Sequence, residues 1–208
     1  MVTDLPILYS FRRCPYAIRA RMALLNAGKE VELREVWLRE RPEHMMEISP
    51  KGTVPVLLLP DGTVLEESMD IILWCSPDSW IKGDWEDLVE RNDGEFKENL
   101  DRYKYADRFP DAGDPVVHRS SVMEILREYE KRLESTSYFC GDELSMGDIA
   151  LGPIVRQLAN TDREWFDDQD LPNVQRWLNG ILEGELFKRC MVKHKQWLPN
   201  SDLVIFSQ

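Results

Sequence analysis

The spacing of apolar residues in the first 76 positions switches between the period of a strand and that of a helix. "LPILY" predicts a short strand, and "EVELREVWL" alternates as a second one. Between them, "PYAIRARMALLNA" places Ile18, Met22 and Leu25 at helical spacing, and Gly28 follows where a helix C-terminus favours glycine. The pattern therefore predicts a strand, a helix and a strand at the start of the chain.

A second group of elements follows an intervening segment. "VPVLLLPDGTVLEE" reads as two strands joined through Asp61-Gly62, a dipeptide typical of hairpins. Ser68 then opens the helical run "SMDIILW". The predicted order is βαβ, an intervening segment and ββα.

From about Trp80 the strand signals stop, until a short apolar tail, "LVIF". "VMEILREYEKRL" carries its apolar residues along one helical face. Similar stripes appear in 85–109, 146–160, 173–183 and 186–197. This half therefore reads as a helical bundle.

A capping motif supports the helical assignment. Ser145-Met146-Gly147-Asp148 precedes an apolar run and has the form of a capping box, which we assign to folding rather than to catalysis. We expect an α/β domain at 1–76, a linker at 77–84 and an all-helical domain at 85–208.

Composition excludes several classes of protein. The chain has 208 residues, 43% of them hydrophobic, which is ordinary for a folded globular protein. No apolar run reaches the roughly 18 to 20 residues that span a bilayer, and "MVTDLPILYS" does not resemble a signal peptide, so we expect a cytosolic protein. The formal net charge of −12 argues against a general nucleic-acid binder.

Cysteine and histidine spacing does not favour a metal site. The four cysteines have no CxxC spacing, and the three histidines are isolated, so we expect neither zinc nor an iron–sulfur cluster. Cys75, Cys140 and Cys190 all fit the role of small buried hydrophobic residues.

Cys14 differs from the others because basic residues surround it. The first 28 residues contain four arginines and one acid, Asp4. Pro15 suits the first position of a helix, so Cys14 falls at or near the N-cap, where backbone donors and the helix dipole lower a cysteine pKa from about 8.5 to roughly 3.5 to 7.5. The basic cluster then makes a site for the thiolate and for an anionic substrate, although Arg19 and Arg21 are equally well explained as a solvated helix face.

Three further features describe a ligand for this thiol. "CPYA" has Ala17 where a dithiol motif has its second cysteine, so a redox cycle must borrow its second thiol. "TVP" suits a cis-proline turn at Pro55 that would turn the main-chain groups of Val54 toward the site. Glu67-Ser68 at a helix start offers an ammonium acceptor and a helix N-terminus for a carboxylate. A ligand with an amino-acid end, a peptide middle and a thiol looks like glutathione.

The chain resembles the cysteine-type glutathione transferases, above all the omega class and its bacterial relatives. The matching features are "YSxxxCPYAxRxRxxL", "LRERPE", "SPKGTVPVL", "DGTVLEES" and the "SMGDIA" box. The resemblance implies a thioredoxin-like domain followed by an all-α bundle, usually as a homodimer. It implies glutathione as co-substrate and thiol transfer or dehydroascorbate reduction, with weak conjugating activity.

The resemblance also assigns roles to residues. Cys14 corresponds to the family's catalytic cysteine, and Val54, before Pro55, to the residue whose main chain pairs with the cysteinyl part of glutathione. Glu67 and Ser68 would hold the γ-glutamyl end.

Other positions of the implied site are less strictly matched. Arg41 stands where the family has a basic residue near the glycine carboxylate, and Arg39 is a neighbouring alternative. Phe11 and Tyr16 would flank the sulfur, and Pro15 completes the set. A hydrophobic co-substrate site would be lined by aromatic residues that can equally be core: Trp85, Tyr103, Tyr105, Phe109 and Trp197.

Alternatives of two classes stay open. Cys14, or the hydroxyl of Tyr9 or Ser10, could instead activate the glutathione thiol, which would give a conjugating enzyme. Maleylacetoacetate isomerisation and reductive dehalogenation are variants at the level of the substrate. A catalytically idle binding protein of the same family is the alternative of a different class.

Overall fold

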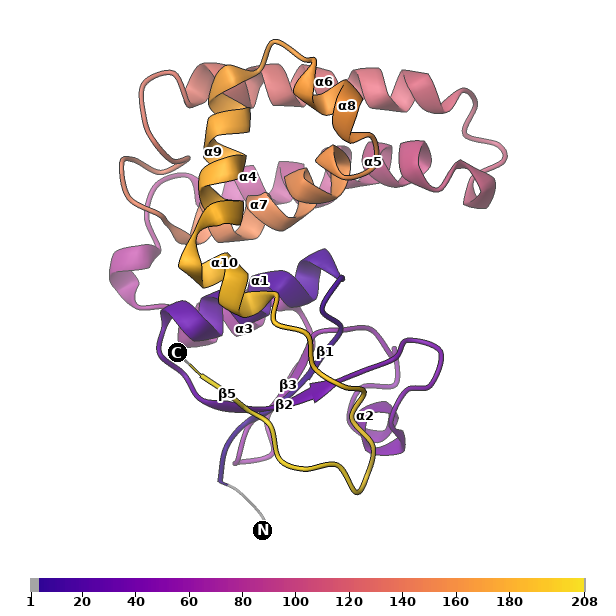
Figure 1. Ribbon diagram of the computed structural model, residues 1–208, viewed down its shortest axis with the longest axis vertical. Coiled ribbons are helices and arrows are strands. Elements are labelled where there is room, and N and C mark those ends of the chain that lie inside the picture. Colours follow the sequence, from indigo (N-terminus) through magenta and orange to yellow (C-terminus); the bar gives the residue numbers. More distant parts are fainter. Residues whose placement is uncertain (1–3, 208) are drawn as a thin grey trace. The chain divides into compact units, whose positions relative to one another are not determined.

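The computed structural model describes residues 4–207 and divides into two compact units (Figure 1). Unit 1 joins the chain up to Pro77 with the segment from Gly184 onward, and unit 2 is Asp78–Glu183. The apolar pattern of the sequence predicts one helical domain over 85–208, whereas residues 184–207 belong to the unit of the N-terminal elements.

Unit 1 is built on a mixed five-stranded sheet with strand order β4-β3-β1-β2-β5. β1 pairs in parallel with β2 and antiparallel with β3, and the two remaining pairs are antiparallel. Its strands are β1 (Ile7–Ser10), β2 (Val31–Glu35), β3 (Val56–Leu58), β4 (Val64–Leu65) and β5 (Ile205–Phe206). Its helices are α1 (Pro15–Asn26), α2 (Glu43–Ile48), α3 (Ser68–Cys75) and α10 (Glu185–Cys190). The βαβ-ββα order predicted from the sequence is confirmed.

Local signals in α1 and in the hairpin act as the sequence predicts. Cys14 is the N-cap of α1 and Pro15 its first residue. At the other end Gly28 has φ +63°, and its N–H donates to the carbonyl of Leu25 at 3.0 Å, so the left-handed conformation closes the helix. Gly62, with φ +89°, forms the turn between β3 and β4.

The C-terminal segment completes the sheet instead of continuing as a helix. α10 ends at Cys190, so the prediction of helix over 186–197 is wrong beyond that residue. The N–H of Trp197 donates to the carbonyl of Glu35 at 2.8 Å, and β5 adds to the open edge of β2. Pairing with this edge satisfies backbone groups that a longer helix would leave exposed. α10 itself packs against α1 (Figure 1).

Unit 2 is helical. Its elements are α4 (Trp85–Arg91), a π-helical turn (Asn92–Phe96), α5 (Lys97–Lys104), α6 (Pro115–Arg132), α7 (Met146–Ala159), α8 (Arg163–Asp167) and α9 (Pro172–Glu183). The first three form one continuous run. Within residues 4–207, no helix combines the length and the apolar character that crossing a membrane requires.

Asp148, the third residue of α7, is a fully buried hydrogen-bonding centre of unit 2. One carboxylate oxygen accepts the N–H and the hydroxyl of Ser145, at 2.9 and 2.6 Å. The other accepts the N–H of Phe139 and the indole N–H of Trp177, both at 2.9 Å. The capping box predicted from the sequence therefore also ties the start of α7 to α9 and to the preceding loop.

Asp148→Ala should destabilise the protein by about 3 to 5 kcal/mol, because it leaves several buried donors without an acceptor. Urea unfolding followed by circular dichroism measures the change. Glu143→Ala is the control, since that side chain is 87% exposed and makes only a surface ion pair. Equal stabilities of the two variants would contradict the central role of Asp148.

Candidate functional site

The Cys14 thiol lies where three chain segments of unit 1 meet. Its Sγ is 3.5 Å from the carbonyl oxygen of Val54, and the side chain is half-buried at the start of α1. Phe11 and Cys14 both pack against an apolar cluster that contains Val54. The N–H of Cys14 donates to the carbonyl of Phe11 at 2.9 Å, which closes a turn immediately before the helix. The thiol, the Phe11 side chain and the Val54 main chain thus form one site.

The segment before β3 is fixed by its backbone. The Val54–Pro55 peptide bond is cis, the isomer that suits the turn considered in the sequence. Gly52 has φ +62°, and an added Cβ would lie 3.1 Å from Nε of Arg41 and Sδ of Met46. The guanidinium of Arg41 donates to the carbonyl of Gly52 at 2.5 Å. Arg41, rather than the neighbouring Arg39, therefore has a demonstrated link to this loop.

The candidate γ-glutamyl site lies at the start of α3. Glu67 is the N-cap residue, its side chain is 69% exposed, and it is paired with the ammonium group of Lys51. Ser68, the first residue of the helix, is buried. Ser49 donates its hydroxyl to Glu66 at 2.5 Å, a second link between the same two segments. The loop that carries Val54 is thus tied to the α3 start that carries Glu67 and Ser68.

Two of the four arginines do not form a solvated face. Arg19 and Arg21 are both 0% exposed, so that interpretation is wrong for them. The guanidinium of Arg19 lies over the ring of Tyr16 at 5.1 Å, and Nη2 of Arg21 contacts Oε2 of Glu35 at 2.9 Å. Burial lowers the pKa of Arg21, an effect that the adjacent carboxylate opposes. For Arg21, a buried counter-ion on another element explains why the prediction failed.

The hydroxyl groups of β1 are engaged or covered. Tyr9 is fully buried, and its oxygen accepts from Arg34 and contacts Nδ1 of His44, both at 2.6 Å. Burial raises the pKa of Tyr9, which opposes use of its phenolate. Ser10 is also 0% exposed. Neither hydroxyl is in a position to meet a thiol from solvent, which disfavours the alternative in which they activate glutathione.

The predicted aromatic residues of unit 2 do not gather at one place. Trp85 begins α4, and Phe109 follows the end of α5, so about 30 Å of helix separates them. Tyr103 packs on Trp165 with ring centroids 6.5 Å apart, and Tyr105 lies under the guanidinium of Arg108 at 4.4 Å.

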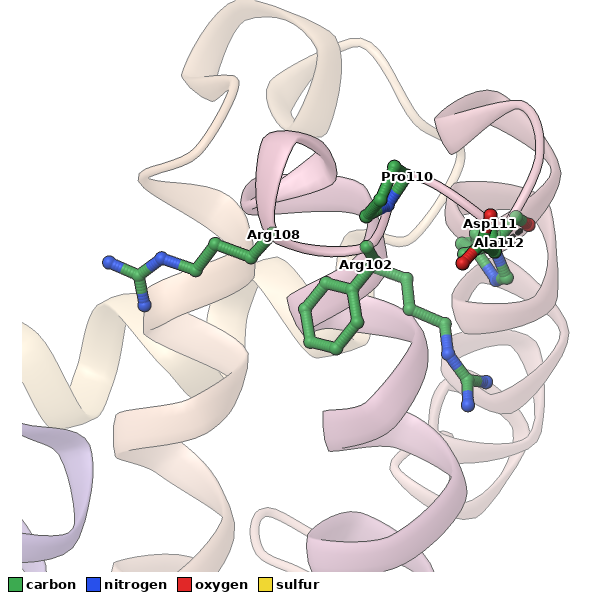
Figure 2. A pocket seen from close by; sticks show the side chains of 7 residues that line it. Arg102, Arg108, Pro110, Asp111 and Ala112 are labelled. Carbon is green, nitrogen blue, oxygen red and sulfur yellow. Dashed lines mark hydrogen bonds between the residues drawn. The ribbon is translucent and has the colours of Figure 1, made fainter.

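Phe109 lines a cavity of about 450 Å³ at the loop between α5 and α6. Figure 2 shows this cavity, with the side chains of Arg102 and Arg108 directed away from each other. The remaining predicted aromatic, Trp197, belongs to unit 1, where its ring lies 4.3 Å below the guanidinium of Arg34.

Sequence reasoning missed two residues of the site. Lys51 contacts Glu67, and Glu35 accepts the N–H of Arg12 at 2.8 Å behind the Cys14 turn. Lys51 lies three residues before Val54 in "SPKGTVPVL", so its nearness to the site could have been inferred from the sequence. Glu35 had none, because alternation in "EVELREVWL" indicates a strand but not the partner of its last residue.

Charge is unevenly divided between the units. Unit 2 has 25 acidic and 13 basic side chains, which accounts for the net charge of −12, whereas unit 1 has 13 of each. The unit that carries Cys14 is therefore neutral as a whole. Over residues 4–207, no group of three or more His, Cys, Asp or Glu side chains has the arrangement to hold a metal ion.

Comparisons with known proteins agree with this arrangement. Residues 8–75 match the model of "Glutathione S-transferase, N-terminal domain", and residues 86–180 match "Glutathione S-transferase, C-terminal domain". Glutathione S-transferase U22 of Arabidopsis thaliana is 25% identical over 164 residues, covering 72% of each chain. Glutathione S-transferase omega-1 of Rattus norvegicus is 26% identical over 189 residues, covering 85% of this chain and 76% of the relative. These similar identities do not single out one class.

The fold is also similar to that of a solved structure. A glutathione transferase from Burkholderia graminis, with two glutathione molecules bound per protein subunit, has a TM-score of 0.75 and 22% sequence identity. The match covers 90% of this chain and 88% of the other. At this identity the likeness establishes the fold.

Thiol alkylation should distinguish Cys14 from Cys75 in the native protein. Burial raises the pKa of Cys75 to about 11, so only about one molecule in a thousand carries that thiolate at pH 8. Brief treatment with iodoacetamide, followed by peptide mass spectrometry, should label Cys14 and leave Cys75 unmodified. In urea both should react, and equal native labelling would contradict the assignment.

Proposed function

Because the chain belongs to the glutathione S-transferase family, we propose that it is a glutathione-dependent thiol transferase that uses Cys14 as its nucleophile. The observation that carries the proposal is the Cys14 thiol at the N-cap of α1, 3.5 Å from the Val54 carbonyl. A sulfur at a helix N-terminus is favoured as thiolate, the form that attacks disulfides. Because Cys14 is partly exposed, its sulfur can reach and attack a dissolved substrate.

The reaction proceeds in two exchanges. The Cys14 thiolate attacks the glutathionyl sulfur of a mixed disulfide; a bond forms between the two sulfurs, and the other thiolate leaves and takes a proton from water. A glutathione thiolate then attacks the glutathionyl sulfur on Cys14. Oxidised glutathione forms and the Cys14 thiolate is restored. One of the two glutathionyl groups in oxidised glutathione comes from the mixed disulfide, and the other from the glutathione that attacks in the second step and is oxidised there.

Ala17 is consistent with this monothiol route. A second cysteine at that position would release the adduct as an internal disulfide, whereas alanine leaves the second step to an external thiol. The second step joins two glutathionyl groups, and the Burkholderia graminis structure holds two glutathione molecules per subunit.

The residues tied around Cys14 suit the parts of glutathione. The Val54 main chain is next to the sulfur and would pair with the cysteinyl amide, while Pro55 shapes the turn. Glu67 would accept the α-ammonium group, and the start of α3 at Ser68 would receive the carboxylate. Lys51, now paired with Glu67, supplies a further cation near that end.

The remaining contacts lie at the sulfur and at the glycine end. Arg41, which already holds the Gly52 carbonyl, would face the glycine carboxylate. Phe11 and Tyr16 would flank the sulfur, with Pro15 fixing the helix start between them. We further propose that the protein acts as a homodimer in the cytosol, and light scattering of the purified protein tests the dimer.

Cys14→Ala should abolish reduction of hydroxyethyl disulfide by glutathione, because no other cysteine lies near the start of α1 to form the mixed disulfide. Cys14→Ser should also lose this activity but raise conjugation to chlorodinitrobenzene, since a hydroxyl can hold a glutathione thiolate without forming a disulfide. Cys75→Ala is the control and should retain turnover. Full thiol transfer in Cys14→Ala would refute the mechanism.

Glu67→Ala should weaken glutathione binding by roughly 1 to 3 kcal/mol, the range for a charge-assisted contact. Calorimetry on the Cys14→Ser background avoids adduct formation. Glu30→Ala is the control, because that exposed acid follows the far end of α1. An unchanged affinity in Glu67→Ala would overturn the placement, and no binding by the parent protein would favour a binding module of another ligand.

A further inference from the structure

Glu35, the last residue of β2, is placed to hold the turn that presents Cys14. Its side chain is almost fully buried, at 7% exposure of the residue. Oε1 accepts the backbone N–H of Arg12 at 2.8 Å, and Oε2 contacts Nη2 of Arg21 at 2.9 Å. We propose that Glu35 is a positioning residue for the Cys14 thiol, acting through the backbone of Arg12. The inference rests on the proposed role of Cys14.

The turn has few other ways to keep its shape. Arg12 and Arg13 are its two central residues, between the Phe11 carbonyl and the Cys14 N–H that close it at 2.9 Å. The dihedral angles of these two residues decide where the Cys14 Sγ lies relative to the Val54 carbonyl. An amide N–H that lost its acceptor in this half-buried place would carry a desolvation cost, and the turn would shift to recover a partner.

Arg21 makes the carboxylate a fixed acceptor. Its guanidinium is fully buried on α1, and it lies over the ring of Phe206 at 5.4 Å. Because α1 holds one carboxylate oxygen through Arg21, the other is directed at the turn. The side chain of Arg12 is anchored separately, by donating to the Met191 carbonyl at 3.4 Å.

Glu35 is not a lone charge behind Cys14, because it is paired with Arg21. A lone carboxylate behind Cys14 would disfavour a thiolate, but the contact with Arg21 balances it. What the turn uses is therefore an oxygen acceptor at the right reach, rather than a negative charge. Glutamine keeps one acceptor oxygen for the Arg12 N–H and has no charge, so it should replace Glu35 at the turn, while its NH2 group leaves Nη2 of Arg21 without an acceptor.

The test compares two variants: Glu35→Gln, which is isosteric with glutamate, and Glu35→Leu, which has no acceptor. The rate of Cys14 alkylation by iodoacetamide is measured against pH; this reaction needs no glutathione, so it is independent of whether the protein transfers thiols. We expect Glu35→Leu to slow alkylation at least tenfold across the pH range, and Glu35→Gln to stay within threefold of the parent. Both should melt at a lower temperature, because Arg21 loses its buried counter-charge.

Leu24→Ala is the stability control, since it removes buried volume from α1 near the end remote from Cys14. It should lower the melting temperature and leave alkylation unchanged. If Glu35→Leu does not fold, Glu35→Asp replaces it, because aspartate keeps the charge but loses reach. Two results would overturn the proposal. One is an alkylation rate within threefold of the parent in Glu35→Leu or in its replacement, Glu35→Asp. The other is a loss of rate in Glu35→Gln or Leu24→Ala as large as that in Glu35→Leu.

Discussion

The backbone pairing of β1 on both of its sides decides where the chemistry of unit 1 assembles. Ser10 pairs with Glu35 in the parallel ladder, and Tyr9 pairs with Val56 in the antiparallel one. The end of β1, the end of β2 and the start of β3 therefore lie at the same end of the sheet. The Cys14 turn, Glu35 and the Val54 carbonyl follow directly from that register, because each lies within a few residues of a paired position. A slip of one residue would turn these side chains to opposite faces.

The buried ion pair between Arg21 and Glu35 lies at the same end of the sheet. It adds little net stability when intact, but losing one partner is costly. Desolvation offsets much of the attraction between Arg21 and Glu35, so the pair is a poor source of net stability. Loss of either partner, however, leaves an uncompensated charge in the core. The C-terminal segment encloses this pair, with Phe206 against Arg21 and Trp197 hydrogen-bonded to the main chain of Glu35. This dependence gives residues 184–207 a physical reason to lie in unit 1.

Elements with local signals could be predicted from the sequence, and those without them could not. Pro15 and Gly28 mark the two ends of α1, Asp61-Gly62 marks the hairpin, and the position of Cys14 follows from Pro15. The "LVIF" tail carries a strand signal, but β5 has only two residues, and nothing in the local sequence identifies its partner, the edge of β2. Composition predicts exposed arginines; Arg21 is buried because its partner is on another element, 14 positions away. Cys14, Phe11 and Val54, which are close to strand ends, lie together, whereas the aromatic residues of unit 2 were chosen by type alone and lie apart.

The division of charge refines what the sequence says about the ligand. A net charge of −12 suggests a protein that repels anions, yet all of that excess belongs to unit 2. Unit 1 is neutral, and several of its cations have partners within the unit: Arg21 pairs with Glu35, Arg41 donates to the Gly52 carbonyl, and Lys51 pairs with Glu67. Ion pairs at the surface can exchange partners at a small cost in free energy, because water and salt screen them, whereas buried pairs cannot. The exposed Lys51 and Glu67 pair can therefore rearrange around a charged group from solvent, whereas the buried Arg21 and Glu35 pair is held in place by its surroundings.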